Sequence, residues 1–558
     1  MSLGSGLYRS AGLVGLWTLV SRLSGMLQQR VLVHFLGQGL ASDLFFVAYR
    51  LPNLLRRFAA EGTMTAAFLP TISEVEAAEG EDGARDMVAR FLGTLGLLLL
   101  LLCILAMVGM GLIMGVQMLG RIAPGAPLGE QFGALGQVLA GTRPAPEGLA
   151  RTVLLGRIMF PYLALVSLTA GLSAVLNLKG RFGLPASVST FFNVTVMAVV
   201  LGGVLLGPPG WREPMQATVL CALAVLAGGL VQLGLLWPSF RSLGNRISWG
   251  FHFGNAGVKR ILRRMVPGLL GTGIHPINVV VSTAIASQLP AGAQTVLYQS
   301  NLMGELVLGL FSASLATVSL PAMSRLADEG DLEGLRGSLA SALRATALMA
   351  IPASVGLAVL ARPILALIFQ SGRYGEAAVA WTAATLPYQA LGLLFVATSR
   401  ISVQALYALK DYRGPALAAL LGFGLNLPLS WILMHRLGTS GIALANSLAS
   451  IAGLAFVAWR LHRRLGQLPL GSVGRGWGAF SLGAACMGAL AWGLGLGVDV
   501  FTFHGPGGTA LRLLPLIAVS GGFYFLLLRM VRVPEAGALW AALAGKLRAI
   551  FRRPSGGG

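Results

Sequence analysis

Long apolar runs are the feature that most limits the folds open to this chain. Residues 95–108, 188–206 and 215–240 contain no acidic or basic side chain. A helix needs about 20 such residues to cross the hydrocarbon core of a bilayer. Inside lipid its backbone groups must be satisfied within the protein, which a helix does by itself. The runs therefore predict an all-α polytopic membrane protein.

Composition supports this class and excludes others. Of 558 residues, 55% are hydrophobic and only 11% are charged, whereas about a quarter of a soluble globular chain is charged. The net charge of +21 would suit nucleic acid, but the Lys and Arg lie between apolar runs rather than along polar faces. The three cysteines, Cys103, Cys221 and Cys486, lie inside apolar segments without paired spacing, so neither a disulfide framework nor a zinc site is predicted.

We predict about fourteen transmembrane helices. Four of them, at 10–36, 43–70, 265–289 and 296–323, are weak by hydropathy because they contain ionisable residues, and a hydropathy window is expected to miss one or two. The first is interpreted as a retained helix, because no small-residue cleavage site follows it. The other predicted spans are residues 88–118, 150–176, 184–207, 215–238, 340–369, 377–408, 415–435, 440–461, 476–498 and 510–532.

The loops between these spans alternate in charge. One set is rich in cations: Arg85, Arg90, Lys179, Arg181, Arg241, Arg246, Lys259, Arg260, Arg263, Arg264, Arg325, Arg336, Lys410, Arg413, Arg460, Arg463 and Arg464. The opposite set has only scattered cations: Arg121, Arg143, Arg212, Arg373 and Arg436. Cytoplasmic loops carry the excess of Lys and Arg. With an even number of spans, both termini are then predicted to be cytoplasmic.

A loose internal repeat suggests two lobes. Residues 66–73 (Ala-Ala-Phe-Leu-Pro-Thr-Ile-Ser) resemble residues 316–324 (Ala-Thr-Val-Ser-Leu-Pro-Ala-Met-Ser), and each closes the second span of a pair. Six predicted spans separate the copies, so they share one orientation and form a parallel repeat. Transporters commonly place the substrate path between two such lobes. One echo is weak evidence alone, because proline often ends helices.

This organisation gives five predicted parts. They are an N-terminal lobe of spans one to six (1–240), a basic cytoplasmic linker (241–264), a C-terminal lobe of spans seven to twelve (265–465), two further spans (466–533) and a basic cytoplasmic tail (534–558). The lobes are expected to enclose a central cavity. The cations at 546–553 either contact anionic lipid or, as we favour, only anchor the topology.

Ionisable side chains within the spans are the strongest functional signal. A charge at mid-bilayer costs about 2.5 kcal/mol or more, so it normally faces a partner or a water-filled cavity. The first two spans contain Arg22, Asp43, Arg50, Arg56 and Arg57, with Glu61 following. Arg57 and Glu61 are spaced to form an ion pair. Arg50 and Arg57 share a helix face on either side of Pro52, which is expected to kink the span.

These arginines predict an anionic substrate. A guanidinium stays charged, and its planar fork of donors matches phosphate oxygens. The alternative is that Arg56 and Arg57 end the span and reach the headgroups. For Arg57 both interpretations stay open, whereas we place Arg22 and Arg56 in a cavity. Glu305 and Arg400 are further intramembrane charges, and His275 is interpreted as a hydrogen-bonded packing residue rather than a proton relay.

No catalytic motif competes with transport. The chain lacks a phosphate-binding Gly-rich loop with a following Lys, a His-Glu-x-x-His motif and a nucleophile elbow. It also lacks a soluble segment long enough for an ATPase domain. We predict a protein that is not an enzyme and has no cofactor or metal. An ion gradient, the membrane potential or the substrate gradient must then drive transport.

A signature in the second span resembles a known family. Residues 41–57 read Ala-Ser-Asp-Leu-Phe-Phe-Val-Ala-Tyr-Arg-Leu-Pro-Asn-Leu-Leu-Arg-Arg, followed by Glu61-Gly62 and residues 67–70. They resemble the MurJ/MviN family, lipid II flippases of the multidrug/oligosaccharidyl-lipid/polysaccharide exporter superfamily. Further matches are Leu176-Asn177 with Arg181-Phe182, residues 369–374, and Tyr407-Ala408 with Asp411 and Pro415. The resemblance implies fourteen helices in two lobes around a cationic cavity, through which a pyrophosphate-sugar head crosses while its polyprenyl tail stays in lipid.

The resemblance also assigns roles. It implies that Arg22 and Arg56 are cavity arginines needed for flipping. It matches Asp43 to a functional acid, which we expect to pair with them or shape the outer gate. Arg57, Glu61 and Arg30 complete the candidate substrate-binding set.

The chain departs from the family pattern at three places. Gln28-Gln29 stand where the family usually has Arg then Asp, and Leu302, beside Asn301, stands in place of a cavity Arg. Ser282 replaces a sodium-binding Asp of some members, although Asn278 fits. Sodium coupling is therefore not indicated, and Arg30 is our candidate for a compensating cation.

Three hypotheses remain open at this stage. The leading one is outward flipping of an undecaprenyl-pyrophosphate-linked peptidoglycan precursor across the bacterial inner membrane by alternating access. The second changes the cargo to another lipid-linked oligosaccharide or an amphipathic drug. The third is a non-transporting scaffold for cell-wall synthesis, which would have no use for costly buried cations. Expected partners are the lipid-linked precursor, membrane lipids and cell-wall synthesis proteins, not nucleic acid, and one copy suffices.

Overall fold

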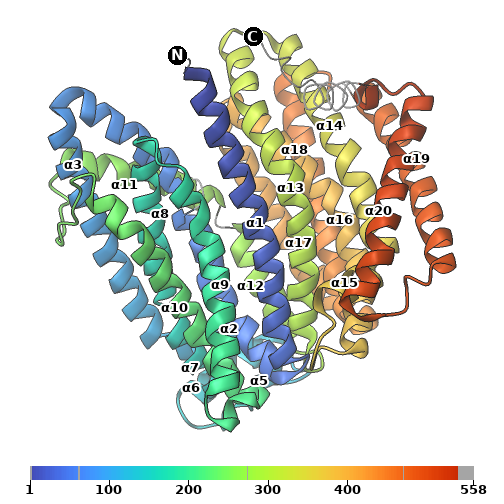
Figure 1. Ribbon diagram of the computed structural model, residues 1–558, viewed down its shortest axis with the longest axis horizontal. Helices are drawn as coiled ribbons and strands as arrows, with labels where there is room; N and C mark the ends of the chain where they lie inside the picture. The colour runs from blue at the N-terminus through green and yellow to red at the C-terminus, as the bar shows by residue number, and fades with distance from the viewer. Residues whose placement is uncertain (1–2, 61–62, 273, 469, 538–558) are drawn as a thin grey trace, which may run out of the picture. The chain divides into compact units, whose positions relative to one another are not determined.

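The computed structural model describes residues 3–60, 63–272, 274–468 and 470–537, and it is helical (Figure 1). Its description of side chains omits residues 3–12, 55–60, 63–67, 266–272, 274–277, 310–318 and 470. Across the described backbone the only strand-like pairing is one β-bridge between Ser371 and Tyr374. The predicted all-α class is confirmed.

The helices follow one another along the chain with short connections. The first group is α1 (Leu3–Leu36), α2 (Leu40–Ala60), α3 (Thr63–Val108), α4 (Met110–Gln117), α5 (Leu119–Ile122), α6 (Leu128–Leu139), α7 (Leu149–Met159), α8 (Tyr162–Leu178), α9 (Gly183–Leu206) and α10 (Pro214–Arg241), with a 3-10 turn at Pro209–Arg212. The second group is α11 (Ala256–Thr272), α12 (Ile274–Ala286), α13 (Ala293–Asp328), α14 (Leu332–Val359), α15 (Ala361–Phe369), α16 (Glu376–Ala408), α17 (Arg413–Leu437), α18 (Thr439–Leu465), α19 (Leu470–Gly497) and α20 (Gly505–Met530).

Ten helical segments within the described residues are long and apolar enough to cross a membrane. They coincide with ten of the predicted spans, so a multi-pass membrane protein is established. The other four predicted spans, 10–36, 43–70, 265–289 and 296–323, each extend into residues whose side chains are not described. The total of fourteen therefore stays a prediction.

Several helices break where the sequence suggested continuity. The predicted span 150–176 is α7 followed by α8, and Pro161 between them has no N–H to continue the hydrogen-bond ladder. Residues 63–70, which we assigned to the end of the second span, begin α3 instead. Helix α3 then kinks at Gly80, where φ is 75°. Glycine adopts that left-handed conformation without steric cost.

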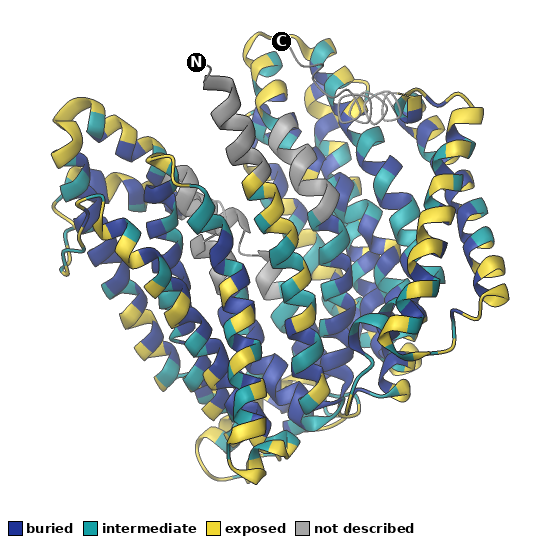
Figure 2. Cartoon of the chain, viewed as in Figure 1, coloured by how far each residue is buried: buried dark blue, intermediate teal, exposed yellow. Residues whose placement is uncertain are grey.

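Many large apolar side chains are exposed on the apolar helices, and Figure 2 shows exposed residues along these helices in yellow. On α3 the large side chains Leu100, Leu101, Leu102, Ile104 and Leu105 are between 44% and 61% exposed. In water such a surface would drive aggregation. In a bilayer it contacts lipid tails, which agrees with the membrane assignment.

The chain forms two compact units. The first is Met1–Tyr298 with Ile368–Ala378, and the second is Gln299–Leu367 with Val379–Gly558. In the first unit α9 packs against α1 and α10, while α11 packs along α3 and α12 contacts α2. In the second unit α17 packs on α18, and α14 packs on α19. The predicted lobes, residues 1–240 and 265–465, are defined by a repeat in the sequence, whereas these two units are defined by their compactness. The division into two lobes therefore stays a prediction.

The same turn ends a helix in each unit. Gly180 after α8 and Lys410 after α16 both have positive φ, 75° and 59°. In each turn the next backbone N–H donates to a helix carbonyl at 2.9 Å, from Arg181 to Leu176 and from Asp411 to Leu406. This hydrogen bond satisfies a carbonyl that the helix itself leaves unpaired. Two matching turns are what a repeated helical hairpin would produce.

Candidate functional site

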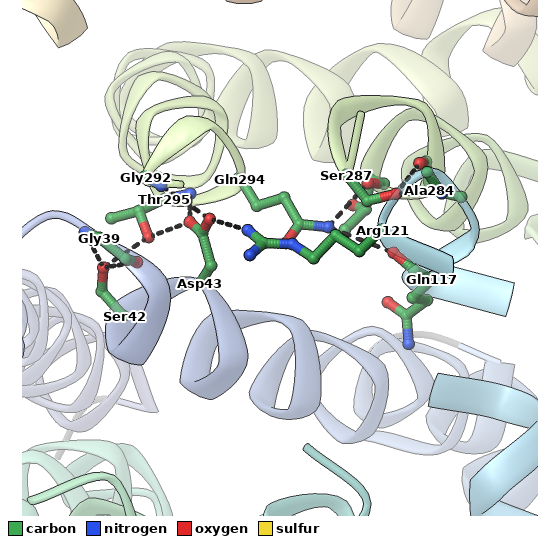
Figure 3. A network of polar contacts seen from close by, with 12 residues as sticks. Gly39, Ser42, Asp43, Gln117, Arg121, Ala284, Ser287, Gly292, Gln294 and Thr295 are labelled. Atoms are coloured by element: carbon green, nitrogen blue, oxygen red, sulfur yellow. Dashed lines mark hydrogen bonds and ion pairs between the residues drawn. The ribbon is translucent and has the colours of Figure 1, made fainter. Parts of the chain in front are cut away.

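The carboxylate of Asp43 is the centre of a buried polar network in the first unit (Figure 3). Its Oδ2 accepts a hydrogen bond from Arg121 Nη2 at 2.7 Å and one from the Gly292 N–H at 2.8 Å. Its Oδ1 accepts from the Thr295 N–H at 2.9 Å and from Thr295 Oγ1 at 2.8 Å. A carboxylate has about four lone-pair sites, so these donors fill its acceptor capacity. We call Asp43, Arg121, Gly292 and Thr295 the Asp43 latch.

Local sequence places each member of the latch. Ser42 Oγ hydrogen-bonds with both the N–H and the C=O of Gly39, at 3.0 and 2.9 Å, which fixes the first turn of α2. Gly292 has a φ of 101°, which favours glycine. Thr295 lies in the first turn of α13, where backbone N–H groups have no intrahelical acceptor. Asp43 therefore caps α13 from a different helix, and its charge suits the positive helix end.

A second layer of hydrogen bonds surrounds the latch. Gln294 Nε2 donates to the carbonyls of Gln117 and Thr283, at 3.2 and 2.9 Å. The Gly120 N–H donates to Ser287 Oγ at 2.8 Å. Gly120 is required here, because a Cβ at this position would lie 2.1 Å from the Gln288 side chain. The layer joins α4 and α5 to the α12–α13 hairpin.

The latch is an ion pair removed from water. Asp43 is fully buried and the Arg121 side chain is 16% exposed. Removing one partner of such a pair costs about 3–5 kcal/mol, because the remaining charge stays buried. The arrangement can hold α2, α5 and the α12–α13 hairpin together. It separates only if all of its hydrogen bonds are replaced.

The described partner of Asp43 is not one of the arginines that we expected. Arg121 was counted only as a scattered loop cation, and no local pattern marks it. It lies 78 residues from Asp43 in the chain. The expected pairing of Asp43 with Arg22 and Arg56 stays a prediction, and the Arg56 side chain lies outside the described residues. The other expectation, a role at the outer gate, remains a proposal.

Arg22 lies in the middle of α1 and is half-buried. Asn193 Nδ2 donates to the carbonyl of Ser21 at 3.0 Å and to Ser24 Oγ at 2.9 Å. Helix α9 thereby fixes the rotation of α1 on either side of Arg22. A substrate-binding role for Arg22 stays a prediction.

Three members of the predicted set lie wholly or partly outside the described residues. Arg56 and Arg57 fall within α2, but their side chains are not described, and Glu61 lies outside the described backbone. The predicted Arg57–Glu61 ion pair stays a prediction. The His275 side chain also lies outside the described residues.

Arg30 contacts the segment 369–374. Its guanidinium donates to the carbonyls of Ile368 and Gln370, at 3.4 and 3.0 Å, near the end of α15 where carbonyls lack helical partners. The Arg373 N–H donates to the His34 carbonyl at 3.0 Å, which holds the same segment to the end of α1. These contacts give Arg30 a structural function. Its predicted role as a compensating cation stays untested.

The positions that depart from the family pattern are neutral, and the two glutamines among them are buried. Gln28 and Gln29 are 3% and 6% exposed. Within the described residues, Gln28 Nε2 and Gln29 Oε1 have no hydrogen-bond partner, which is uncommon for buried polar atoms. Asn301, beside Leu302, accepts a hydrogen bond from Gln389 Nε2 at 3.0 Å.

Two other intramembrane charges pair with each other. Arg400 Nη2 and Glu305 Oε1 lie 3.7 Å apart in the second unit, as expected for charges at membrane depth. In the part of the chain that the structure describes, no group of three or more His, Cys, Asp and Glu side chains is placed to hold a metal ion.

Comparisons with known proteins cover most of the chain. The profile of the family described as "Lipid II flippase MurJ" matches residues 32–509. A "Probable lipid II flippase MurJ" of Vibrio cholerae is 30% identical over 536 residues, which cover 94% of this chain and 96% of that protein. A second protein of that description, from Haemophilus influenzae, is 30% identical, and the match covers 85% of this chain and 90% of that protein.

Two solved structures show the same fold. "Lipid II flippase MurJ, inward closed conformation" aligns with a TM-score of 0.71 at 21% identity, over 93% of this chain and 100% of that one. The inward-facing conformation of a MATE family multidrug resistance transporter of the MOP superfamily aligns with a TM-score of 0.59 at 14% identity, over 80% and 94%. At these identities the likeness concerns the fold alone.

Proposed function

Because this chain belongs to the MurJ family of lipid II flippases, we propose that it moves lipid II from the cytoplasmic to the outer leaflet of a bacterial inner membrane. The main support for this proposal is the family match over residues 32–509. The described part of the chain also has ten helical segments long and apolar enough to cross a membrane. The cargo is an undecaprenyl-pyrophosphate-linked peptidoglycan precursor. Transport needs no catalytic group on the protein.

The anionic head binds to guanidinium groups. We assign Arg22 and Arg56 to the pyrophosphate, with Arg57, Glu61 and Arg30 around them. Charge-assisted hydrogen bonds from Arg to phosphate oxygens are about twice as strong as neutral ones. A pyrophosphate that leaves a cell with a negative interior moves with the potential. Each elementary charge gains about 2.3 kcal/mol per 100 mV.

The Asp43 latch serves as the outer gate. It joins α2, α5 and the α12–α13 hairpin, and Arg121 belongs to the cation-poor set of loops that the positive-inside rule puts outside the cell. With both termini cytoplasmic, the start of α2 lies at the outer surface. Alternating access then requires the latch to open when the head group leaves and to close afterwards.

A second cargo class is favoured by specific residues. Gln28, Gln29 and Leu302 are neutral where the family usually carries charge, and the two glutamines are buried. A cavity with fewer cations suits a head group with less charge than a pyrophosphate. Another lipid-linked oligosaccharide or an amphipathic drug is therefore the alternative cargo.

Genetic replacement tests the proposal. The native flippase of a bacterium is depleted, and this chain or its Arg56→Ala variant is supplied. Growth and lipid II translocation with the wild type, but not with Arg56→Ala, support lipid II flipping through a cationic cavity. Arg436→Ala, which removes an exposed cation from the cation-poor set, is the matched control and should rescue fully. If no version rescues while each is present in the membrane, lipid II is the wrong cargo, and transport in liposomes separates another cargo from a scaffold.

A further inference from the structure

Arg50 is a buried cation that the proposed function has not used. It lies on α2, seven residues after Asp43 and so on the same helix face, and it is 6% exposed. Its guanidinium donates to Thr283 Oγ1 on α12 and lies 5.3 Å from the ring centroid of Tyr298 on α13. The ring of Phe46 stacks on the same tyrosine at 4.5 Å.

The charge of Arg50 has no acidic partner among the described side chains. No carboxylate of the described residues lies within ion-pair distance of it, and its contacts on α12 and α13 are a hydroxyl and an aromatic ring. Asp43 is the nearby acid, but Arg121, Gly292 and Thr295 occupy its oxygens. One described carboxylate therefore lies near two guanidinium groups, that of buried Arg50 and that of half-buried Arg121, and a surplus positive charge remains among the described side chains.

Packing alone does not explain this arrangement. Replacing buried charges by apolar side chains of similar volume is often neutral or stabilising. A methionine at position 50 could fill the space against Tyr298 without the desolvation cost of a guanidinium. A charge retained here indicates a conformation in which it meets an anion.

We propose that Arg50 is a reserve cation for the substrate, shielded by Thr283 and Tyr298 while the α12–α13 hairpin packs on α2 and bound to the anionic head group once the hairpin moves away. The inference rests on the proposed function. Gate opening and exposure of this cation are coupled, because the hairpin supplies the latch donors Gly292 and Thr295 and also both described partners of Arg50.

The position of Arg50 gives the coupling a direction. It lies seven residues before Arg57 on the same helix face, which at 1.5 Å per residue is about 10 Å closer to the start of α2. A pyrophosphate that leaves Arg57 would meet Arg50 next on its way to the outer gate. The ligand chemistry is that of a phosphate or pyrophosphate anion bound by a charge-assisted hydrogen bond.

Three variants test the inference in the full-length protein: Arg50→Met, Arg50→Lys and the control Arg151→Met. Arg151 is a partly buried arginine whose Nε donates to Thr218 Oγ1 at 3.3 Å, so the control also removes an Arg–hydroxyl contact. Lipid II flipping is measured in proteoliposomes. Thermal unfolding is measured in detergent with and without inorganic pyrophosphate.

If Arg50 is a reserve cation for the substrate, its replacement should slow flipping without lowering the melting temperature. Arg50→Met should flip about tenfold or more slowly, as the loss of a hydrogen bond to a charged group implies, while its melting temperature equals or exceeds that of the wild type. Arg50→Lys keeps the charge and should recover most of the flipping. Pyrophosphate should raise the melting temperature of the wild type and of Arg151→Met, but not that of Arg50→Met.

Other outcomes overturn the inference. If Arg50→Met melts several degrees lower and Arg50→Lys does not restore flipping, Arg50 only supports the fold. If Arg50→Met flips at the wild-type rate, the cation does not meet the substrate. If the wild type does not flip lipid II at all, the proposed function fails separately. The pyrophosphate measurement then decides: equal stabilisation of the wild type and Arg50→Met, or none of either, refutes anion binding by Arg50.

Discussion

Asp43→Asn should open the latch while leaving the size of the side chain unchanged. The asparagine oxygen still accepts the two hydrogen bonds from Thr295. Its amide NH₂ replaces Oδ2 and faces two other donors, Arg121 Nη2 and the Gly292 N–H. Two hydrogen bonds to a charged acceptor are lost, and the guanidinium of Arg121 keeps its charge without a counter-ion.

The size of the effect follows from these contacts. A hydrogen bond to a charged group contributes about 1.5–3 kcal/mol, and breaking a buried ion pair costs about 3–5 kcal/mol. We expect the free energy of opening the α12–α13 hairpin to fall by about 3–5 kcal/mol. At about 1.4 kcal/mol per factor of ten, the open population rises by about two to four orders of magnitude.

Amide hydrogen exchange measures this opening directly, because protected amides exchange only when their local structure opens. Peptides that contain Gly292 and Thr295 should exchange faster in Asp43→Asn by about that factor. Peptides from α17 and α18, in the second unit, should exchange as in the wild type. A double variant, Arg121→Gln in the Asp43→Asn background, removes the stranded charge and should restore part of the protection.

Asp331→Asn is the matched control. Asp331 also caps a helix, since it accepts the Gly334 N–H at 2.8 Å at the start of α14, but it does so at an exposed position without an arginine. Asparagine caps a helix about as well as aspartate, so Asp331→Asn should change exchange little, and any effect should stay within α14. Unchanged exchange around Gly292 in Asp43→Asn, or strictly additive effects of Asp43→Asn and Arg121→Gln, would show that the latch does not hold the hairpin.

Three further predictions concern the turns and the linker. The hydrogen bond from Arg460 lowers the pKa of Asp411. This pair therefore stabilises the fold fully above the unfolded pKa of about 3.9, and the stabilisation is lost as pH falls through the lower folded pKa. Asp411→Asn should lower the melting temperature at pH 7, and the melting temperatures of variant and wild type should converge at the acid end of a pH series. Gly180→Ala should cost about 1 kcal/mol, because its φ of 75° is strained for any residue with a Cβ, as chemical denaturation can measure. Gly93→Ala would put a Cβ 1.7 Å from the carbonyl oxygen of Ser248, so the linker must shift. Proteolysis within residues 245–255 should then be faster than in the wild type. An unaltered cleavage rate would contradict the contact.

Several fold-level features were accessible from the sequence because they depend on local patterns. Ten of the predicted apolar runs form helical segments long and apolar enough to cross a membrane. This could be predicted because the hydrophobicity of a run and the hydrogen bonding of its helical backbone depend only on its own residues. The proline at position 161 also has a local effect, yet we missed the break that it causes between α7 and α8.

The candidate site was only partly accessible. Asp43 was found because an acid inside a span is costly, and the cost does not depend on the partner. Its partner Arg121 was missed, because it is 78 residues away and its loop looks like any other. Arg30 was placed near the substrate from its spacing to Gln28 and Gln29, whereas its described contacts are carbonyls more than three hundred residues later.

By itself the sequence determined that the chain lies in a bilayer, which segments form helices, and that the predicted cargo is an anion. Transfer free energy and side-chain charge are properties of each segment alone. Tertiary structure decided which charges are neutralised. The acid at position 43 meets Arg121 and the first turn of α13, while the described contacts of Arg50 are with a hydroxyl and a ring. The physical reason is that Coulomb energy depends on distance in space and on burial, and both are set by how remote helices pack.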